Sequence, residues 1–571
     1  MNHSTPLSLK VRRHLVIGVL ALATTGILTR AVYLQVVHKD FLQGQGDERF
    51  LRVIQTPAYR GMIVDRNGEP LAVSSPVDSA WANPAVVLSQ PGQLAKLAKI
   101  LGINPKRLQD RLEERANKEF VYLRRHLPPD TAQRVLDLKI KGVHLQREYR
   151  RFYPTAEVTS HLLGFTNIDD IGQEGLELAF NSELQGKPGS KRVLKDRFGR
   201  IVDNIESIRL PESGKTLVLS IDRRIQYLAY RALKTAVNKH SAAGGSAVVL
   251  DVDTGEILAM VNQLAANPND RQQRKSALLR NRAVTDVYEP GSTLKPFTIA
   301  MALESGAYRP TTLINTNPGY LRVGRNRVRD MHNYGLIDVA RIISKSSNVG
   351  TSKIALSLPA EQLWTLYKNL GFGSLPYMGF TGEQDGVLRH FSQWSPIGHA
   401  NHSFGYGLSV TTLQLAHAYS VLAADGIKRP LSLLRLEHPP HEEARVLSAT
   451  TARQVRAMME AVVSNKGTAP KAAVPSYRVA GKTGTAHKTV DGRYARNRYF
   501  SVFAGMVPAE QPRLVMVVMV DDPRKGGHYG GQVAAPVFST VMSGALRMLN
   551  VTPDEVPAVN LAVATPVENK Q

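Results

Sequence analysis

The sequence predicts an α+β protein with an N-terminal transmembrane helix, an elongated mixed pedestal domain, and a C-terminal domain in which helices flank an antiparallel sheet. The chain has 571 residues, of which 43% are hydrophobic and 21% are charged. This composition is globular, and the length exceeds one ordinary domain. A long apolar run lies near the N-terminus, and the second half alternates strand-like runs with long helical stretches. We therefore expect at least two domains beyond a membrane anchor.

The N-terminal apolar run has the pattern of a membrane anchor. It is uncharged from Leu15 to Thr29, and the apolar pattern resumes after Arg30 and continues to Val37. Three basic residues precede the run, namely Lys10, Arg12 and Arg13. Basic residues on this side favour an N-terminus kept in the cytoplasm. We expect a cytoplasmic tail at 1–14 and a single-pass anchor at 15–37, with the rest of the chain translocated.

A cleaved signal peptide is the competing interpretation of the same run. The uncharged stretch is short for a membrane span, and ALA at 21–23 resembles a cleavage site. The uncleaved anchor is favoured because Arg30 can extend its charged end towards the outer interface while 31–37 lengthen the helix.

The remaining chain divides by composition. Residues 38–55 are polar and charged and are typical of a linker. Residues 56–210 mix short strand-like runs with charged helical ones and carry no catalytic motif, so we expect a structural pedestal there. The composition changes near 210, and 211–551 are expected to form the second domain. The tail, 552–571, lacks periodicity and is expected to be flexible.

The second domain carries the clearest strand signals. Asp253-Thr254-Gly255 lies between two apolar runs and predicts a β-hairpin. Three further candidate strands follow near the C-terminus, in the stretches YRVAGKTGTA, YFSVFAGMVP and RLVMVVMVDDP. Long helical stretches between 292 and 460 connect them. The interpretation is an antiparallel sheet with helices packed on its faces.

Charge and cysteine content restrict the function. Lys and Arg number 72 against 48 Asp and Glu, a formal net charge of +24 that suits a nucleic acid, an anionic membrane surface or an acidic polymer. No zinc-finger spacing or RNP-type aromatic motif accompanies the charge, which argues against nucleic acid. The chain has no cysteine, so disulfides, thiolate catalysis and cysteine-ligated metals are excluded.

The stretch EPGSTLKPF, Glu289 to Phe297, contains the one S-x-x-K of the chain, at Ser292 and Lys295. Alone, this motif arises by chance in a chain of this length. On a helix, positions i and i+3 share a face, so the Lys295 amine should lie beside the Ser292 hydroxyl. Pro296 is tolerated in a first helical turn, which predicts that Ser292 lies at the helix start.

Two further motifs follow in the same domain. SSN spans Ser346–Asn348, and KTGT spans Lys482–Thr485 on a predicted strand. Each is weak singly, but all three motifs in one predicted domain and in this order argue against chance.

The chemistry explains why a serine and two lysines belong together. A serine hydroxyl is a poor nucleophile until a base takes its proton. Lys295 can be that base only where desolvation or a second cation lowers its pKa, and Lys482 is the candidate for that cation. The backbone N–H groups of Ser292 and Thr485 can form an oxyanion hole for a tetrahedral intermediate.

The other motif residues suit supporting roles. Ser346 can relay a proton to a leaving amine, and the Asn348 amide can hold a peptide-like substrate in register. Gly484 has no side chain, which would let a substrate backbone lie along the strand. A P-loop interpretation of AGKTGTA requires a glycine where Ser476 stands, so the phosphate cradle is missing.

These motifs resemble those of the penicillin-binding protein and serine β-lactamase superfamily. RGMIVDRNGEPLA, RFYP, HLLGF and GQEGLE resemble pedestal motifs of class B penicillin-binding proteins. VYEPGSTLKP, SFGYGLSVTTLQLA and YGGQVAAPVF resemble the cell-division transpeptidases of that class. The resemblance runs from the anchor to about Asn550. One departure is Ala156, where class B enzymes usually carry a glycine after R-x-Y-P, and it affects only the expected loop geometry.

The resemblance implies a serine D,D-transpeptidase of the bacterial inner membrane, with a periplasmic catalytic domain. Such an enzyme cross-links peptidoglycan stem peptides in septal wall synthesis through an acyl-enzyme at Ser292. The residues implied in substrate binding are Lys482, Thr483, Gly484 and Thr485 for the donor, and Tyr406 and Tyr529 for the pocket wall. Two loop tyrosines are equally often plain packing.

The resemblance also implies partners and alternatives. β-Lactams should acylate the same serine, and a shape-elongation-division-type glycosyltransferase and other division proteins are the expected partners. No metal or organic cofactor is implied. A D,D-carboxypeptidase would use the same motifs and deliver water, as would a β-lactamase, against which the anchor, the pedestal motifs and the chain length argue. A non-catalytic β-lactam-binding scaffold stays open as well.

Overall fold

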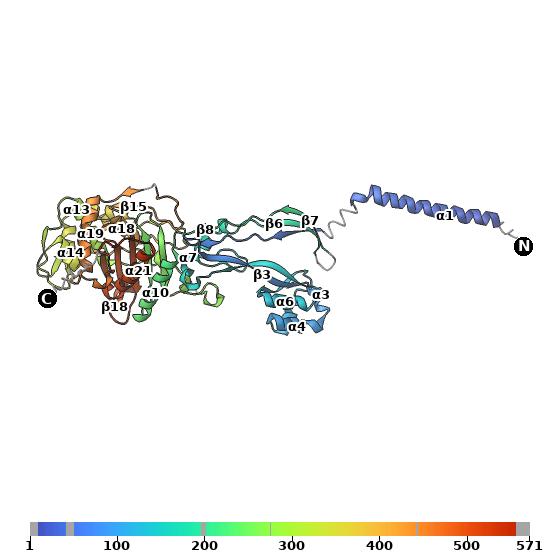
Figure 1. Cartoon of the computed structure of the whole chain (residues 1–571), viewed down its shortest axis with the longest axis horizontal. Coiled ribbons are helices and arrows are strands. Elements are labelled where there is room, and N and C mark those ends of the chain that lie inside the picture. The colour runs from blue at the N-terminus through green and yellow to red at the C-terminus, as the bar shows by residue number, and fades with distance from the viewer. Residues whose placement is uncertain are drawn as a thin grey trace, which may run out of the picture. The chain divides into compact units, whose positions relative to one another are not determined.

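The computed structural model describes residues 9–41, 51–195, 201–274, 276–440, 443–490 and 492–555 (Figure 1). The predicted flexible tail lies outside the described residues from 556 onwards, as do 1–8 of the predicted cytoplasmic tail and 42–50 of the predicted linker. The chain forms two compact units. The first comprises Met1–Tyr59, Ser75–Arg150 and Gly186–Gly214, and the second comprises Arg60–Ser74, Arg151–Gln185 and Lys215–Gln571.

The residues predicted as one continuous pedestal, 56–210, are therefore shared between two units. Segments 60–74 and 151–185 belong to the same unit as the C-terminal domain. They also belong to its hydrophobic core, since Ile63, Leu71 and Leu176 join the cluster that continues to Leu546. Composition did not indicate this division, because the segments of 56–210 in either unit contain short strands and helices.

The N-terminal helix α1 (Leu9–Val32) continues as a π-helix, η1 (Tyr33–Val37). It begins six residues before the predicted span. Within the described ranges, Leu9–Val37 is the one helix long and apolar enough to cross a membrane, and none of it is buried. Its threonine hydroxyls bond to carbonyls one turn back, as at Thr24 to Leu20 (2.8 Å), which satisfies them without water.

The rest of the first unit contains a three-stranded antiparallel sheet and a helical cluster. The sheet has the strand order β1-β6-β7. The cluster packs helices on the strand pair formed by β4 and the second half of β3 around a separate apolar core. The elements that lie wholly or mostly in this unit are β1 (Leu51–Thr56), β3 (Pro70–Ala82), α3 (Pro84–Leu88), α4 (Pro91–Leu101), α5 (Pro105–Glu113), β4 (Val121–Leu127), α6 (Pro129–Asp137), β5 (Val143–Phe152), β6 (Gly189–Lys195) and β7 (Ile201–Arg209). Residues 70–74 of β3 and 151–152 of β5 belong to the second unit.

The second unit is built on a five-stranded antiparallel sheet with the order β10-β9-β19-β18-β17. The strands are β9 (Gly244–Asp251), β10 (Ile257–Gln263), β17 (Ala480–Val490), β18 (Arg493–Val507) and β19 (Leu514–Asp521). Asp253-Thr254-Gly255 turns β9 into β10, as predicted. The expected antiparallel sheet flanked by helices is confirmed, and the fold is mixed α+β. β17, which carries KTGT, is an edge strand.

Helices cover both faces of this sheet. A Cβ at Gly245 of β9 would contact Leu233 of α10 (Arg223–Lys239), whereas Ser246 hydrogen-bonds to Thr412 of α18 (Thr412–Ala423), 2.7 Å between hydroxyls. Successive strand residues point to opposite faces, so α10 and α18 lie on opposite sides. Figure 1 shows α21 (Ala535–Met548) beside α10, and the two helices pack together.

Smaller elements complete the second unit. Before the sheet these are β2 (Ile63–Val64), η2 (Ala156–Val158), α7 (Ser160–Leu163), α8 (Gly175–Ala179), α9 (Asn181–Leu184) and β8 (Leu217–Val218). After β10 come η3 (Arg271–Gln273), α11 (Ser276–Leu279), α12 (Arg282–Thr285), η4 (Gly291–Leu294), α13 (Lys295–Glu304), β11 (Leu313–Asn315), β12 (Tyr320–Val323), β13 (Asn326–Arg329), β14 (Leu336–Asp338), α14 (Val339–Lys345), α15 (Asn348–Leu356) and α16 (Ala360–Leu370). The remainder are η5 (Phe391–Gln393), α17 (Pro396–Ser403), β15 (Ile427–Lys428), β16 (Ala444–Arg445), α19 (Ala449–Val463), η6 (Pro470–Ala472) and α20 (Gly530–Val533).

Three of the pedestal-like motifs meet in one buried ion-pair network. Arg60 of RGMIVD and Arg151 of RFYP both bind Glu177 of GQEGLE, with Nε–O distances of 2.8 and 2.6 Å. All three side chains are at most 6% exposed. Arg60 also donates to the Asp170 carbonyl (3.0 Å) and Arg151 to the Gly61 carbonyl (2.8 Å). The network holds distant segments of the chain together around one carboxylate.

Candidate active site

Ser292 lies in a 3-10 turn, η4, immediately before α13. Pro296 is the second residue of α13, where its missing N–H costs no helical hydrogen bond. Ser292 was expected at the helix start, and it lies in the turn that leads into the helix. The turn is fixed from outside, since the Gly291 N–H donates to the Gly405 carbonyl (3.0 Å). Ser292 is half-buried, whereas its neighbours Gly291 and Thr293 are buried.

The edge strand β17 packs directly against this turn. A Cβ at Gly484 would lie 2.7 Å from the Pro290 carbonyl oxygen and 2.9 Å from Thr293 Cγ2. The absent side chain therefore makes room for the turn that carries Ser292. This is a packing reason for the glycine, and the expectation that a substrate backbone lies along the strand stays a prediction. The physical reason is that backbone approach between a strand and a turn leaves no space for a Cβ.

The structure brings Lys295, Ser346 and Lys482 together. The Ser346 hydroxyl accepts hydrogen bonds from Lys295 Nζ (3.1 Å) and from Lys482 Nζ (2.9 Å). Lys295 also donates to the Ser346 carbonyl (2.5 Å), and Lys482 to the Thr483 carbonyl (3.1 Å). The motifs STLK, SSN and KTGT, which are separated by 50 to 190 positions in sequence, thus meet at the Ser346 hydroxyl. This common contact explains why the three motifs occur together.

Both lysines are fully buried, with 0% exposure, and neither forms an ion pair with a carboxylate within the described ranges. Burial, reinforced by the charge of Lys482, holds the pKa of Lys295 well below its usual range, while Asp330 opposes the shift. Burial also lowers the pKa of Lys482 to about 7. A desolvated amine with a cationic neighbour is available as a base near neutral pH. This is the condition that the sequence hypothesis set for Lys295.

Ser346 has an unusual backbone conformation, with φ 58° and ψ 42°. It ends α14 in the left-handed region, which non-glycine residues rarely adopt. Backbone strain of this kind is typical of functional sites. Here it turns the hydroxyl towards the two lysines instead of towards the helix.

Asn348 begins α15, beside the lysine pair. Its side-chain amide donates to the Arg329 carbonyl (3.0 Å), which fixes the amide with its carbonyl oxygen free of a protein donor among the described residues. Asp330 secures the same turn, since it accepts from the Ser347 hydroxyl (2.6 Å) and from the Val349 N–H (3.0 Å). Sequence reasoning missed Asp330, because no spacing pattern connects it to SSN.

The remaining predicted residues take different positions. The Thr485 hydroxyl accepts the Gly530 N–H (3.1 Å), so it is held beside α20, and Tyr529 precedes that helix with 42% exposure. The Thr483 hydroxyl lies 3.0 Å from that of Thr468. Tyr406 is half-buried, with its ring centroid 5.8 Å from that of Tyr494. No contact places either tyrosine on Ser292 in the described part of the chain.

Glu289 is a second residue that sequence reasoning passed over, although it lies three positions before Ser292. Its carboxylate accepts the Gly407 N–H (2.8 Å) and the Tyr494 hydroxyl (3.0 Å). Burial raises the pKa of Glu289 above its usual value. It connects the turn of Ser292 to the loop of Tyr406 and to the β17–β18 hairpin. An acidic residue next to a proline gives no sequence signal of such long-range contacts.

This fold and the centre formed by Lys295, Ser346 and Lys482 indicate the protein family. The chain matches the model of the penicillin-binding protein transpeptidase domain over residues 245–543 and that of the penicillin-binding protein dimerisation domain over 55–219. It belongs to the class B penicillin-binding proteins, and it is a peptidoglycan D,D-transpeptidase homologue of the FtsI and PenA type.

Relatives with a curated name support the same assignment. Peptidoglycan D,D-transpeptidase FtsI of Escherichia coli K12 is 44% identical over 95% of this chain and 92% of its own. Probable peptidoglycan D,D-transpeptidase PenA of Neisseria meningitidis serogroup A is 42% identical over 98% of this chain and 96% of its own. The predicted family and the predicted enzyme class are confirmed.

Two solved structures add a comparison of folds. The apo transpeptidase domain of Burkholderia pseudomallei penicillin-binding protein 3 is 45% identical, has a TM-score of 0.55, and covers 59% of this chain and 98% of that one. A peptidoglycan synthetase from Bifidobacterium adolescentis has a TM-score of 0.71 over 89% of this chain and 98% of that one. At 24% identity, the second shows the fold alone.

Proposed function

We propose that Ser292 is the nucleophile of a septal D,D-transpeptidase and that Lys295 is its base. The observation that carries the proposal is the Ser346 hydroxyl shared by two fully buried lysines without a carboxylate partner among the described residues. A carboxylate here would hold the lysines protonated, whereas burial favours their neutral forms. The centre is therefore suited to taking a proton from a hydroxyl.

The proposed acylation uses these groups in turn. Lys295 takes the proton of Ser292 as the oxygen attacks the carbonyl carbon of the penultimate D-alanine of a donor stem. The tetrahedral intermediate collapses, the peptide bond breaks, and the proton passes from Lys295 through the Ser346 hydroxyl to the leaving amine of D-alanine. The N–H groups of Ser292 and Thr485 stabilise the oxyanion.

The donor is held by the groups around the cleft. Lys482, Thr483 and Thr485 bind its terminal carboxylate by charge-assisted hydrogen bonds, and the free carbonyl of the Asn348 amide accepts a substrate N–H. Tyr406 and Tyr529 line the outer wall. The amine of a neighbouring stem next attacks the acyl-enzyme, which restores the Ser292 hydroxyl and forms the cross-link. β-Lactams enter by the first step and remain on Ser292.

The N-terminal helix is proposed as an uncleaved anchor in the inner membrane, with its N-terminus in the cytoplasm and the catalytic unit in the periplasm. Lys10, Arg12 and Arg13 at the N-terminal end of the apolar run support this orientation. A shape-elongation-division-type glycosyltransferase and other division proteins are the proposed partners, because cross-linking requires newly polymerised strands.

Labelling with a fluorescent penicillin tests the nucleophile. We expect one labelled serine, no label on Ser292→Ala, and unchanged labelling of Ser420→Ala, a matched variant of a serine in α18. Persistent labelling of Ser292→Ala would exclude the proposed nucleophile.

A stem-peptide thioester, supplied with and without an amine acceptor, tests the acyl transfer. A transpeptidase diverts product from hydrolysis to the amide as the acceptor concentration rises. Hydrolysis that does not respond to the acceptor would assign a D,D-carboxypeptidase, and labelling without turnover would assign a non-catalytic scaffold.

A further inference from the structure

A short hairpin next to the active site presents an unusually basic face. β12 and β13 pair so that Tyr320 lies opposite Arg329 and Arg322 lies opposite Arg327. These four residues share the outward face, because Leu321 and Val328 pair on the inward one. The three arginines are exposed, and Arg327 lies over the Tyr320 ring, 5.0 Å from its centroid. We call Arg322, Arg327 and Arg329 the arginine ribbon.

The inward face of the hairpin anchors the ribbon to the core of the catalytic unit. Val323 and Val328 are buried against Ala400 and Phe404, and Tyr406 packs at the edge of the same cluster. The ribbon is therefore a fixed surface, and its arginines are displayed by a packed scaffold.

The arginine ribbon has no counter-charge. None of its three guanidinium groups forms an ion pair within the described ranges. Residues 309–353 contain eight basic and two acidic side chains, an excess of six that is a quarter of the net charge of the chain. Both acidic groups are engaged elsewhere, Asp330 with Ser347 and Asp338 with the Arg341 N–H. Like charges directly opposite on a ribbon are destabilising, so a bound anion would relieve this arrangement.

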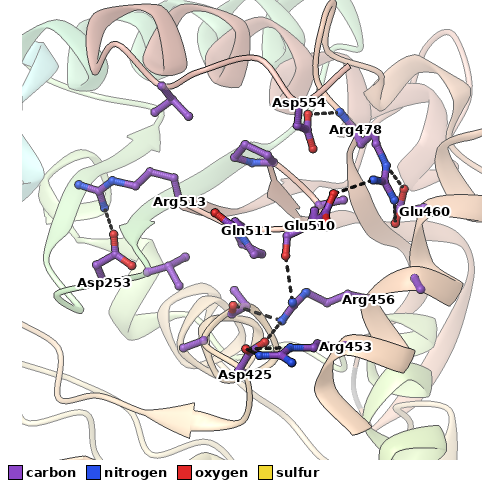
Figure 2. A pocket seen from close by; sticks show the side chains of 18 of the residues that line it. Asp253, Asp425, Arg453, Arg456, Glu460, Arg478, Glu510, Gln511, Arg513 and Asp554 are labelled. Atoms are coloured by element: carbon purple, nitrogen blue, oxygen red, sulfur yellow. Dashed lines mark hydrogen bonds and ion pairs between the residues drawn. The ribbon is translucent and has the colours of Figure 1, made fainter. Parts of the chain in front are cut away.

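A second arginine-rich region of the same unit shows the contrast. The residues labelled in Figure 2 line a cavity of about 1360 Å³, and the arginines among them are paired with carboxylates. Arg453 and Arg456 both bind Asp425 (2.5 and 2.6 Å), and Arg478 binds Glu460 (2.9 Å). Those arginines brace the protein. The ribbon arginines are free to bind a ligand.

The arginine ribbon leads directly into the active site. The carbonyl of Arg329, its last residue, accepts the hydrogen bond that orients Asn348, and the next residue, Asp330, holds the turn of Ser347. A ligand bound on the ribbon would therefore lie beside the amide proposed to hold the donor backbone.

We propose that the arginine ribbon binds carboxylates of the donor stem peptide upstream of its D-alanines. This inference rests on the proposed function. Peptidoglycan stem peptides carry free carboxylates besides the terminal one, and a guanidinium fork matches a carboxylate in two parallel hydrogen bonds. The ribbon contacts a part of the donor that does not react, so it contributes equally to ground-state and transition-state binding and acts on KM.

The test compares two donors on the full chain in detergent. One is a stem pentapeptide ending in D-Ala-D-Ala with free upstream carboxylates, and the other has those carboxylates amidated. The variant is Arg322→Gln with Arg327→Gln. Its control is Arg231→Gln with Arg547→Gln, which removes the same charge from α10 and α21 on the opposite face of the sheet. Release of D-alanine gives kcat and KM, and fluorescent penicillin measures the reactivity of Ser292 independently.

We expect the wild-type protein and the control to favour the acidic donor by about 10-fold in kcat/KM at low salt, through KM. The variant should lose this preference while its penicillin acylation rate stays unchanged. A preference that the variant retains, or its absence in the wild-type protein, overturns the inference. So does a preference that follows the charge of the acceptor stem, or a variant that loses only binding to phosphatidylglycerol vesicles. If penicillin does not label Ser292 at all, it is the proposed function that fails.

Discussion

Two clusters of buried cations in the second unit are treated in opposite ways. Arg60 and Arg151 share the carboxylate of Glu177, so their charges are compensated inside the protein. Lys295 and Lys482 share only a neutral hydroxyl, that of Ser346, and their charges are not compensated. The first arrangement joins segments of the chain, and the second gives amines whose pKa values lie below the usual range of lysine. The partner of a buried cation thus decides whether it serves structure or reactivity.

Removing Lys295, the proposed base, should have the largest effect and tests whether its amine serves reactivity. Lys295→Ala should lower the acylation rate by about 10²- to 10⁴-fold, because the Ser292 proton loses its acceptor. Thermal unfolding should show a smaller loss of stability than Glu177→Ala causes, since this change leaves no buried charge without its partner. Stopped-flow acylation by fluorescent penicillin measures the rate, with Lys234→Ala in α10 as control. A variant that acylates normally would assign the base elsewhere.

Removing the carboxylate of Glu177 should have the opposite effect: it should lower stability and leave the acylation rate unchanged. Glu177→Ala leaves two buried guanidinium groups unpaired and should lower the free energy of unfolding by about 3–5 kcal/mol. Urea denaturation followed by circular dichroism measures the change, and the folded fraction should retain its acylation rate. Glu212→Gln, which breaks the exposed pair with Lys187, is the matched control and should cost about 0–1 kcal/mol. A loss at Glu177 no larger than that of the control would contradict a structural role for the network.

The pH dependence sharpens the catalytic half of the comparison. Lys295 acts as a base when neutral, so acylation should rise with pH as its proton leaves. The charge of Lys482 lowers the pKa of Lys295. Lys482→Met removes that charge, raises the pKa of Lys295, and should move the rising limb of the pH–rate profile to higher pH, whatever happens to the maximal rate. Lys488→Met, on the same strand but paired with Asp521, should leave the limb in place. A limb that stays fixed in the Lys482 variant would show that the two amines do not interact.

The smallest expected effect is on the free energy of unfolding and comes from backbone strain. Such strain occurs near the Glu177 network, at Ala156, and in the lysine site, at Ser346. Ala156, close to Arg151, has a φ of +45°, in the left-handed region where the family resemblance expects a glycine. Ala156→Gly should raise the free energy of unfolding by about 0.5–1 kcal/mol, because glycine adopts this conformation without a Cβ clash. Urea denaturation checks it, and Ala132→Gly, in a right-handed helix, should go the other way. An unchanged or lowered value at 156 would show that the loop is not strained.

The candidate catalytic residues were accessible to sequence reasoning because their chemistry imposes short patterns. S-x-x-K, S-x-N and K-T-G each fix two groups on one local element, and a shared target hydroxyl requires all three. The antiparallel sheet was accessible for a similar reason, since apolar runs and the Asp253–Gly255 turn are local signals.

What sequence reasoning missed depends on contacts between distant residues. Asp330 and Glu289 act through hydrogen bonds to backbone and side chains that no spacing rule connects to them. The packing role of Gly484 was missed because the strand alone does not reveal what packs against it. The distribution of 56–210 over two units also follows from tertiary burial, to which local composition is blind.

The close contact at Gly484 also limits how this protein can escape antibiotics. The wall of the cleft here is backbone against backbone, and at Gly530, too, a Cβ would lie 2.1 Å from the Val502 carbonyl oxygen. Any residue other than glycine at these positions would push the nucleophile turn or α20 away from β17 and disable the cell's own cross-linking along with the drug reaction. We therefore expect variants that resist β-lactams to keep glycine at 484 and 530 and to change other positions around Ser292.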